Sequence, residues 1–519
     1  MKRRTFCAAA AACLAAGALR VPAASAAGTG DLVGHAVPDD VYPFAFRSDR
    51  SMQDVVHDFY YSDRLFEHPA QEYDHTLATV TLGLVAAASN TIRSDEHWWE
   101  SGDVGRQDGI ADAFDRLGFA NCAYPGYEQD LNTMETDVGC ALAQKTLVRQ
   151  DGRVTIVAMM LRGAGYGMEW VSNLELGAEG GHAGFVGAVP FAFAALQRYL
   201  RQAEQKTDLG TIRLWLGGYS RGAAVANLLA ARVRRELPQI TPENTFVYTF
   251  ATPAALAAAD CPELQADYDN NHAPDGILKE NWGESNIFNL LSSGDVVTRV
   301  MPEQWGFHRN GNDRFLPSTR NAAELAALDA RGAAFGGTAL VFSDLATSED
   351  TDALVEAALK FCVSRKNYHE KYEAAFRDMM RCASTRTKEE IVDGRLMDEE
   401  ETVAWLRSMD SMKQFTWGRV LSCVLAASAM SRPILERLGD NLSIHVRQIV
   451  LPMLAVGLCY KVEADVLKML VYYLASLVSV RGPLDNVLRV AFCHYPENYI
   501  ALMEYYDPDE HAMQPQTRD

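Results

Sequence analysis

The sequence predicts an α/β fold with a mostly parallel sheet, on three observations. Short apolar runs recur after about residue 135, and longer runs with helical periodicity separate them. Strands that alternate with helices in this way need right-handed crossover connections, which make neighbouring strands parallel. The chain has 519 residues, of which 48% are hydrophobic, and this is enough to bury a large core.

Each element of this core has its own signal in the sequence. The predicted strands are short runs rich in β-branched and aromatic residues, and they span 154–161, 212–216, 246–250 and 287–291. The predicted helices span 186–203 and 223–236, where apolar residues recur at helical spacing. We therefore assign residues 135–320 to the α/β core.

The rest of the chain divides into four segments. Residues 1–26 have the pattern of a signal peptide, with a basic start, an apolar run from Phe6 to Leu19, and small residues at 24–26. Residues 27–134 are predicted to be a mainly helical segment that packs on the core, with a polar, loop-rich beginning at 27–70. Residues 321–480 are expected to form a helical insertion or cap, and 481–519 a C-terminal return.

The signal predicts an exported protein, extracellular or associated with the cell surface. The pair Arg3-Arg4 before Thr5-Phe6 also resembles a twin-arginine signal, and both export routes stay open. Cleavage after residue 26 would leave 44 basic against 68 acidic residues, a net charge of −24. Such a charge argues against nucleic acid as a partner. No other apolar stretch reaches the length of a membrane span, and the oligomeric state stays open.

The cysteines give no metal signal. Eight remain after the signal, without the C-x-x-C spacing of metal sites, so neither a metal nor another cofactor is expected. Cys122 and Cys140 flank a loop and could pair in an oxidising compartment.

The segment Gly218–Gly222 reads Gly-Tyr-Ser-Arg-Gly and lies between a predicted strand and a predicted helix. This G-x-S-x-G context is typical of a nucleophile elbow, in which the turn is too tight for large side chains beside the serine. Ser220 is therefore the candidate nucleophile. The following helix begins with small residues and would direct its positive N-terminal end toward a developing oxyanion.

A serine nucleophile needs a base and an acid that orients the base, and in this fold they follow in the order Ser, Asp or Glu, His. Asp295 comes directly after the predicted strand 287–291, which places it at the same sheet edge as Ser220. It is the candidate acid. A simple turn after Gly294 is the alternative interpretation.

The motifs around Ser220, Asn244–Pro253 and Asp295–Pro302 resemble the class 3 lipase family of the α/β-hydrolase superfamily, here as a bacterial member. Ala251 stands where that family has Gly, Thr298 replaces a Pro, and Pro302 falls one residue late. The resemblance covers about residues 135–320. It implies an α/β-hydrolase core and hydrolysis of carboxylic esters, with acylglycerols or other lipid esters as substrates.

The resemblance also implies the oxyanion donors. Arg162-Gly163-Ala164 ends the first core strand and is similar to the family's Arg-Gly-Ser/Thr motif. The backbone N–H groups of Ala164 and Arg221 would then form the oxyanion hole. Ala164 lacks the hydroxyl that the family carries at this position.

Two histidines compete for the role of the base. His308 lies close after Asp295 in sequence, whereas His494 lies nearly two hundred residues later. Topology favours His494, because the histidine of this fold normally follows a further structural element, and Tyr499 follows it as an aromatic residue does in the family. His182 precedes Ser220 and is expected to be structural.

These residues predict an exported serine hydrolase that cleaves lipid esters through a Ser220–His494–Asp295 triad and an acyl-enzyme. A short-chain or carbohydrate esterase, or a thioesterase, would use the same groups. A non-catalytic binding protein on the same scaffold is the alternative from another class.

Overall fold

The computed structural model describes the chain in separate ranges, all within the compact unit Val33–Asp519. These ranges are 34–48, 54–89, 107–127, 136–149, 152–164, 167–257, 285–299, 301–316, 322–330, 334–335, 338–339, 345–374, 377 and 493–506. The predicted signal peptide and most of the predicted insertion at 321–480 lie outside the described residues.

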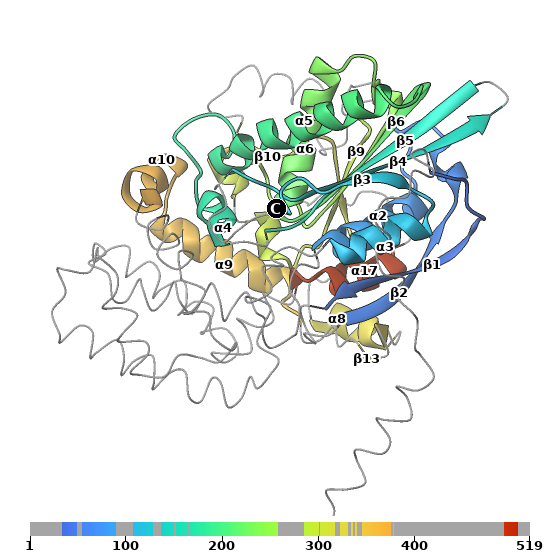
Figure 1. Cartoon of the computed structure of the whole chain (residues 1–519). Helices are drawn as coiled ribbons and strands as arrows, with labels where there is room; N and C mark the ends of the chain where they lie inside the picture. Colours follow the sequence, from blue (N-terminus) through green and yellow to red (C-terminus); the bar gives the residue numbers. More distant parts are fainter. Residues whose placement is uncertain are drawn as a thin grey trace, which may run out of the picture. The chain divides into compact units, whose positions relative to one another are not determined.

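A seven-stranded sheet forms the centre of the structure, in the order β11-β9-β7-β6-β5-β4-β3 (Figure 1). The five strands from β11 to β5 run parallel, and β4 and β3 extend the sheet antiparallel. The strand bounds are β3 Ala120–Ala123, β4 Cys140–Arg149, β5 Gly152–Leu161, β6 Thr211–Tyr219, β7 Thr245–Phe250, β9 Ile287–Leu291 and β11 Asn312–Phe315. The predicted α/β fold with a mostly parallel sheet is confirmed.

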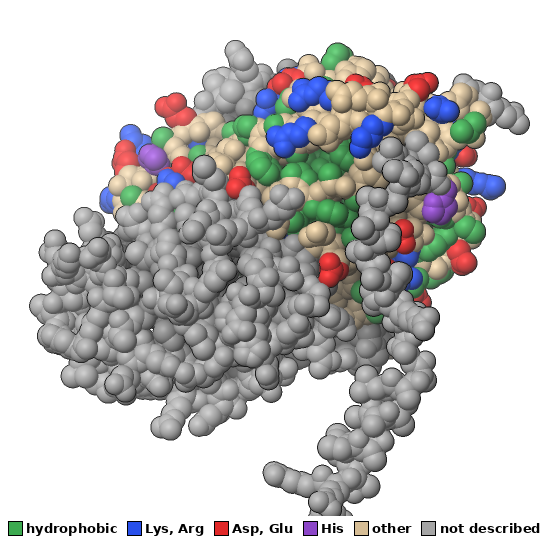
Figure 2. All heavy atoms as spheres, viewed as in Figure 1, with side chains coloured by type: hydrophobic (Ala, Val, Ile, Leu, Met, Phe, Trp, Pro, Cys, Tyr) green, Lys and Arg blue, Asp and Glu red, His purple; other side chains and the backbone are tan. Residues whose placement is uncertain are grey.

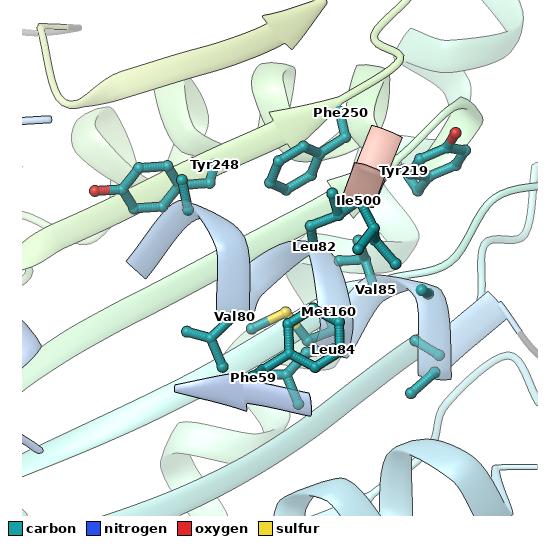
Figure 3. Packing of buried hydrophobic residues seen from close by; sticks show 14 of the residues in the cluster. Phe59, Val80, Leu82, Leu84, Val85, Met160, Tyr219, Tyr248, Phe250 and Ile500 are labelled. Carbon is teal, nitrogen blue, oxygen red and sulfur yellow. The ribbon is translucent and has the colours of Figure 1, made fainter. Parts of the chain in front are cut away.

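Helices cover both faces of this sheet. One face packs against α5 (Ala183–Glu204) and α6 (Arg221–Glu236), through buried side chains such as Leu196, Val225 and Leu229. The other face packs against α2 (His75–Ser89), α3 (Asp108–Arg116) and the C-terminal α17 (Pro496–Glu504). Figure 3 shows this second layer, where Val80, Leu82 and Val85 of α2 meet Met160 of β5.

The beginning of the described chain differs from the prediction. The segment expected to be polar and loop-rich holds an antiparallel pair, β1 (Asp40–Arg47) with β2 (Asp54–Tyr61), and β3 places part of the expected helical segment in the central sheet. Phe44, Phe46, Phe59 and Tyr61 are fully or almost fully buried. Their spacing of two is the strand signal, and Pro43 and the interleaved charged and polar residues obscured it.

The helix α5 is the one helix within the described ranges that is long and apolar enough to cross a membrane. Eleven of its residues are buried, and several of them belong to the cluster that packs against the sheet. A core helix passes the same test of length and composition, and the packing of α5 is that of a core helix.

The segment after residue 320 contributes further helices, namely α8 (Ala322–Asp329), α9 (Ser348–Phe361) and α10 (Arg365–Tyr368), the last continuing as a π-helical turn over His369–Glu373. The described residues also form two short antiparallel pairs: β8 (Leu256–Ala257) with β10 (Phe307–His308), and β12 (Ala334–Phe335) with β13 (Thr338–Ala339). Cys122 and Cys140, whose pairing the sequence left open, are both free thiols on β3 and β4.

Figure 2 shows charged side chains of both signs on this face, with several Lys and Arg side chains near its upper centre and Asp and Glu side chains mainly toward its edges. The side chains on this face therefore do not form a field of one sign.

Candidate active site

Ser220 occupies a sharp turn between β6 and α6. Its backbone has φ 53° and ψ −122°, a left-handed conformation that is strained for a residue with a side chain. Its N–H donates to the carbonyl oxygen of Phe250 on β7 at 3.0 Å, which ties the turn to the neighbouring strand. This is the strained strand-to-helix elbow that the sequence predicts.

The two flanking glycines are required by close backbone contacts. A Cβ on Gly218 would lie 2.5 Å from the carbonyl oxygen of Gly222. A Cβ on Gly222 would lie 2.3 Å from the carbonyl oxygen of Leu161 and 2.4 Å from that of Arg162. The N-terminus of α6 can therefore contact the end of β5 this closely only because both positions lack a side chain.

The structure brings Ser220, His494 and Asp295 together. The Nε2 of His494 lies 2.8 Å from Ser220 Oγ, and its Nδ1 lies 2.8 Å from Asp295 Oδ2. A carboxylate can only accept hydrogen bonds, so Nδ1 carries a proton and Nε2 is free to accept the hydroxyl proton of Ser220. Asp295 is fully buried, whereas the side chain of His494 is 21% exposed.

Asp295 is held from several sides. Its Oδ1 accepts the N–H of Val297 at 2.9 Å, and its Oδ2 accepts the hydroxyl of Tyr499 at 2.7 Å. Burial and the nearby carboxylate of Asp295 raise the pKa of Tyr499 well above its ordinary value, so this hydroxyl remains a donor. Tyr499 is a site residue that the sequence suggested only as an aromatic residue five positions after His494.

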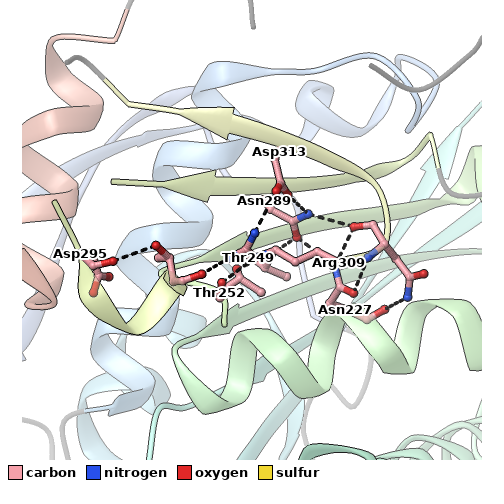
Figure 4. Close-up of polar contacts among 9 residues, drawn as sticks. Asn227, Thr249, Thr252, Asn289, Asp295, Arg309 and Asp313 are labelled. Atoms are coloured by element: carbon pink, nitrogen blue, oxygen red, sulfur yellow. Dashed lines mark hydrogen bonds and ion pairs between the residues drawn. The ribbon is translucent and has the colours of Figure 1, made fainter. Parts of the chain in front are cut away.

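A buried polar network anchors the loop of Asp295 (Figure 4). Thr298 donates its hydroxyl to the carbonyl oxygen of Asp295 at 2.8 Å, and Arg309 donates to the carbonyl oxygen of Thr298. Arg309 also donates to the carbonyl oxygen of Thr252 at 2.6 Å and to Asp313 at 2.9 Å. Thr298 stands where the class 3 pattern has Pro, and its hydroxyl gives that departure a local role.

The predicted oxyanion segment lies beside the elbow. Leu161, the last residue of β5, pairs with Gly218, and a Cβ on Gly163 would lie 3.6 Å from that of Ser220. Arg221 is the first residue of α6, where backbone N–H groups have no partner within the helix. Ala164 and Arg221 thus come from the two segments that flank Ser220.

The side chain of Arg221 is buried and contacts two neighbouring segments. It donates to Asn173 Oδ1 at 2.9 Å and to the carbonyl oxygen of Asp137 at 3.2 Å. Burial lowers its pKa to about 10, so the side chain stays charged at neutral pH. The N-terminal end of α6 is therefore fixed by its own first side chain.

The other two histidines lie elsewhere. His308 sits on β10, with Nδ1 3.4 Å from the carbonyl oxygen of Gly306. His182 caps α5 by accepting the N–H of Phe185 at 3.4 Å, and burial lowers its pKa to about 3. Among the residues that the structure describes, no group of three or more His, Cys, Asp or Glu side chains could hold a metal ion.

Residues 159–305 match the lipase (class 3) family. This lipase-family segment contains Ser220 and Asp295, together with Ala164 and Arg221. With the sheet order and the elbow, the match confirms the predicted α/β-hydrolase core. His494 lies far beyond this segment, and its candidacy rests on the order of elements in this fold and on Tyr499 after it.

Several solved structures that resemble the chain are described as lipases. One is described as a triacylglycerol lipase with a serine protease triad, with 16% identity, a TM-score of 0.30, and coverage of 47% of this chain and 80% of that one. A Rhizomucor miehei lipase with its propeptide has 14% identity, a TM-score of 0.28, and coverage of 46% and 66%. A lipase of Rhizopus microsporus var. chinensis has 13% identity, a TM-score of 0.24, and coverage of 34% and 57%. The comparison with curated proteins gives no match.

Proposed function

We propose that this protein is an exported serine hydrolase that cleaves carboxylic esters of lipids through an acyl-enzyme. The observation that carries the proposal is the unbroken hydrogen-bonded chain Ser220–His494–Asp295, with 2.8 Å at each link. The match of residues 159–305 to class 3 lipases supports lipid esters as the substrates. The N-terminal pattern of residues 1–26 supports export, from a bacterial cell if the twin-arginine pattern is used.

In the proposed reaction, Nε2 of His494 takes the proton of Ser220 as Oγ attacks the ester carbonyl. The positive charge that develops on the imidazole faces the buried carboxylate of Asp295, which also fixes the ring through Nδ1. The N–H groups of Ala164 and Arg221 would receive the negative charge that forms on the carbonyl oxygen.

The imidazolium then gives its proton to the leaving alcohol, and the ester bond breaks to leave an acyl group on Ser220. Water repeats the sequence in the second half: His494 takes a proton from the water, which attacks the acyl carbon and releases the acid. The proton returns to Ser220. Every step uses groups of this chain, so the proposed reaction needs no cofactor.

The test is hydrolysis of nitrophenyl butyrate and nitrophenyl palmitate by residues 27–519. We expect Ser220→Ala and His494→Ala to lose nearly all activity, and His308→Ala to keep it, as the matched control. If His308→Ala is the inactive variant instead, His494 is not the base. The ratio of palmitate to butyrate turnover separates a lipase from a short-chain esterase.

A well-folded wild type that hydrolyses neither ester and takes up no fluorophosphonate would contradict the proposal. That outcome would favour a binding protein on the same scaffold.

A further inference from the structure

A buried ion pair lies at the end of β5, beside the predicted oxyanion segment. Arg162 donates from Nη1 to Glu169 Oε2 at 3.0 Å and from Nη2 to Glu169 Oε1 at 2.9 Å. The exposed fractions of the two side chains are 0% and 1%. The pair is thus bidentate and withdrawn from water, and the proposed reaction above gives it no role.

Arg162 makes a third hydrogen bond, to its own neighbour. Its Nη1 also donates to the carbonyl oxygen of Gly163 at 2.9 Å. That carbonyl and the N–H of Ala164 belong to the same peptide unit. A trans peptide is planar, and its C=O and N–H point in opposite directions. Fixing the carbonyl of Gly163 therefore fixes the direction of the Ala164 N–H.

The surroundings leave this peptide little freedom. The N–H of Gly163 faces Ser89 Oγ at 3.3 Å, and the N–H of Arg162 donates to the carbonyl oxygen of Gly139 at 3.0 Å. The side chain of Arg162 passes directly over Gly139, where a Cβ would lie 2.2 Å from Nε. Its guanidinium also lies 5.5 Å from the ring centre of Tyr127. The segment is anchored on both sides of the turn.

Stability alone does not account for such a pair. Bringing two charges out of water is unfavourable, and buried ion pairs can often be replaced by apolar side chains without loss of stability. A cation that donates to the Gly163 carbonyl, however, also polarises the peptide and strengthens the N–H on its far side as a donor. Ala164 lacks the hydroxyl found in class 3 lipases, so this peptide would have to supply its donor unaided.

We infer that Arg162, held by Glu169, is a positioning residue that orients the Gly163–Ala164 peptide so that its N–H stabilises the oxyanion. The inference rests on the proposed serine hydrolase function. It concerns how the donor is aimed, whereas the proposed function concerns the nucleophile and base. The inference can therefore fail while the proposed function stands.

The test compares an ester with its thiono analogue, nitrophenyl butyrate against the same compound with C=S in place of C=O. Sulfur is a weak acceptor, so an oriented N–H accelerates the oxygen ester much more than the sulfur one. In Arg162→Met/Glu169→Met, which removes both charges, we expect kcat for the oxygen ester to fall about 10²–10³-fold with KM little changed. The thiono ester should lose far less, so the preference for oxygen should collapse.

Two further variants keep the test decisive. Glu169→Gln retains shape and one acceptor, and it should lower the oxygen preference part of the way even if the double variant fails to fold. Lys145→Met is the matched control, since it breaks another ion pair, from Lys145 Nζ on β4 to Asp63 Oδ1 at 2.6 Å, in which the lysine is fully buried. It should alter stability and leave the oxygen preference unchanged.

Equal losses for both esters would leave the oxygen preference unchanged. That result would overturn the inference and make the Arg162–Glu169 pair a structural one. If the wild type is active and depends on Ser220, but the oxygen preference is the same in the Arg162 and Glu169 variants, only the inference about Arg162 is wrong. If the wild type does not use Ser220 at all, the proposed function fails and the inference fails with it.

Discussion

Replacing Gly222 with Ala tests how closely the elbow must approach β5. The new Cβ would lie 2.3 Å from the carbonyl oxygen of Leu161, where an ordinary contact is at least 3.4 Å, so the segments must separate by about 1 Å. One proposed oxyanion donor lies on each of these segments. A misplacement of this size is expected to lower kcat about 100-fold.

The assay is kcat for nitrophenyl butyrate, normalised to the folded fraction by circular dichroism, because overpacking also destabilises by about 1–3 kcal/mol. Gly187→Ala on α5 is the control, since its Cβ would meet only Thr136 at 3.5 Å. That variant should keep full activity and gain helix stability. If Gly222→Ala has the kcat of the wild type, the close approach does not set the oxyanion geometry, and the reasoning is refuted.

Two further predictions concern groups around the site. Tyr499→Phe removes the 2.7 Å hydrogen bond to the buried carboxylate of Asp295, and it should lower the free energy of unfolding by about 1.5–3 kcal/mol in urea titrations. The exposed Tyr60→Phe serves as its control, and equal stability of both variants would contradict this role of the hydroxyl. His182 has a pKa lowered from 6.5 to about 3 by burial, so the unfolded state takes up the proton first. The stability that this difference contributes is present above pH 6.5 and is lost as pH falls toward 3. His182→Asn keeps a capping side chain and should flatten that loss, by about 1 kcal/mol per pH unit. Parallel urea midpoints of the wild type and the variant between pH 7 and pH 5 would count against this assignment.

The parts of the fold that the sequence predicted well carry strong local signals. Residues 154–161 and 246–250 are apolar runs that a single Thr interrupts, and both became strands buried along most or all of their length. The glycines around Ser220 identified the elbow because the backbone there tolerates no side chain. In contrast, β4 mixes Gln144, Lys145 and Thr146 with apolar residues, because Lys145 is buried against Asp63. No local pattern could reveal that pairing.

The residues of the candidate site also fall into two groups, those that a sequence signal indicates and those that only the tertiary structure reveals. Asp295 was predictable because a strand end fixes its place, and His494 because the order of elements in this fold favours a late histidine. Glu169 and Arg309 were not singled out, since their importance comes from contacts rather than from a motif. Arg309 contacts the Asp295 loop through the carbonyl oxygen of Thr298. Contacts of this kind are set by tertiary packing, and the surrounding sequence gives no sign of them.

The position of His494 has a consequence for how the chain tolerates length. The residue lies 199 positions after Asp295, and contacts with distant parts of the chain hold it in place. Tyr219 donates to its carbonyl oxygen at 2.9 Å, and α17, which follows it, packs on α2. Ser48 further ties this helix to the first hairpin through Glu497 at 2.7 Å. The position of the base is therefore set by the packing of α17 and not by its distance along the chain from Asp295. A change in the number of residues between acid and base would leave the three side chains together as long as β11, Arg309 and α17 keep their contacts.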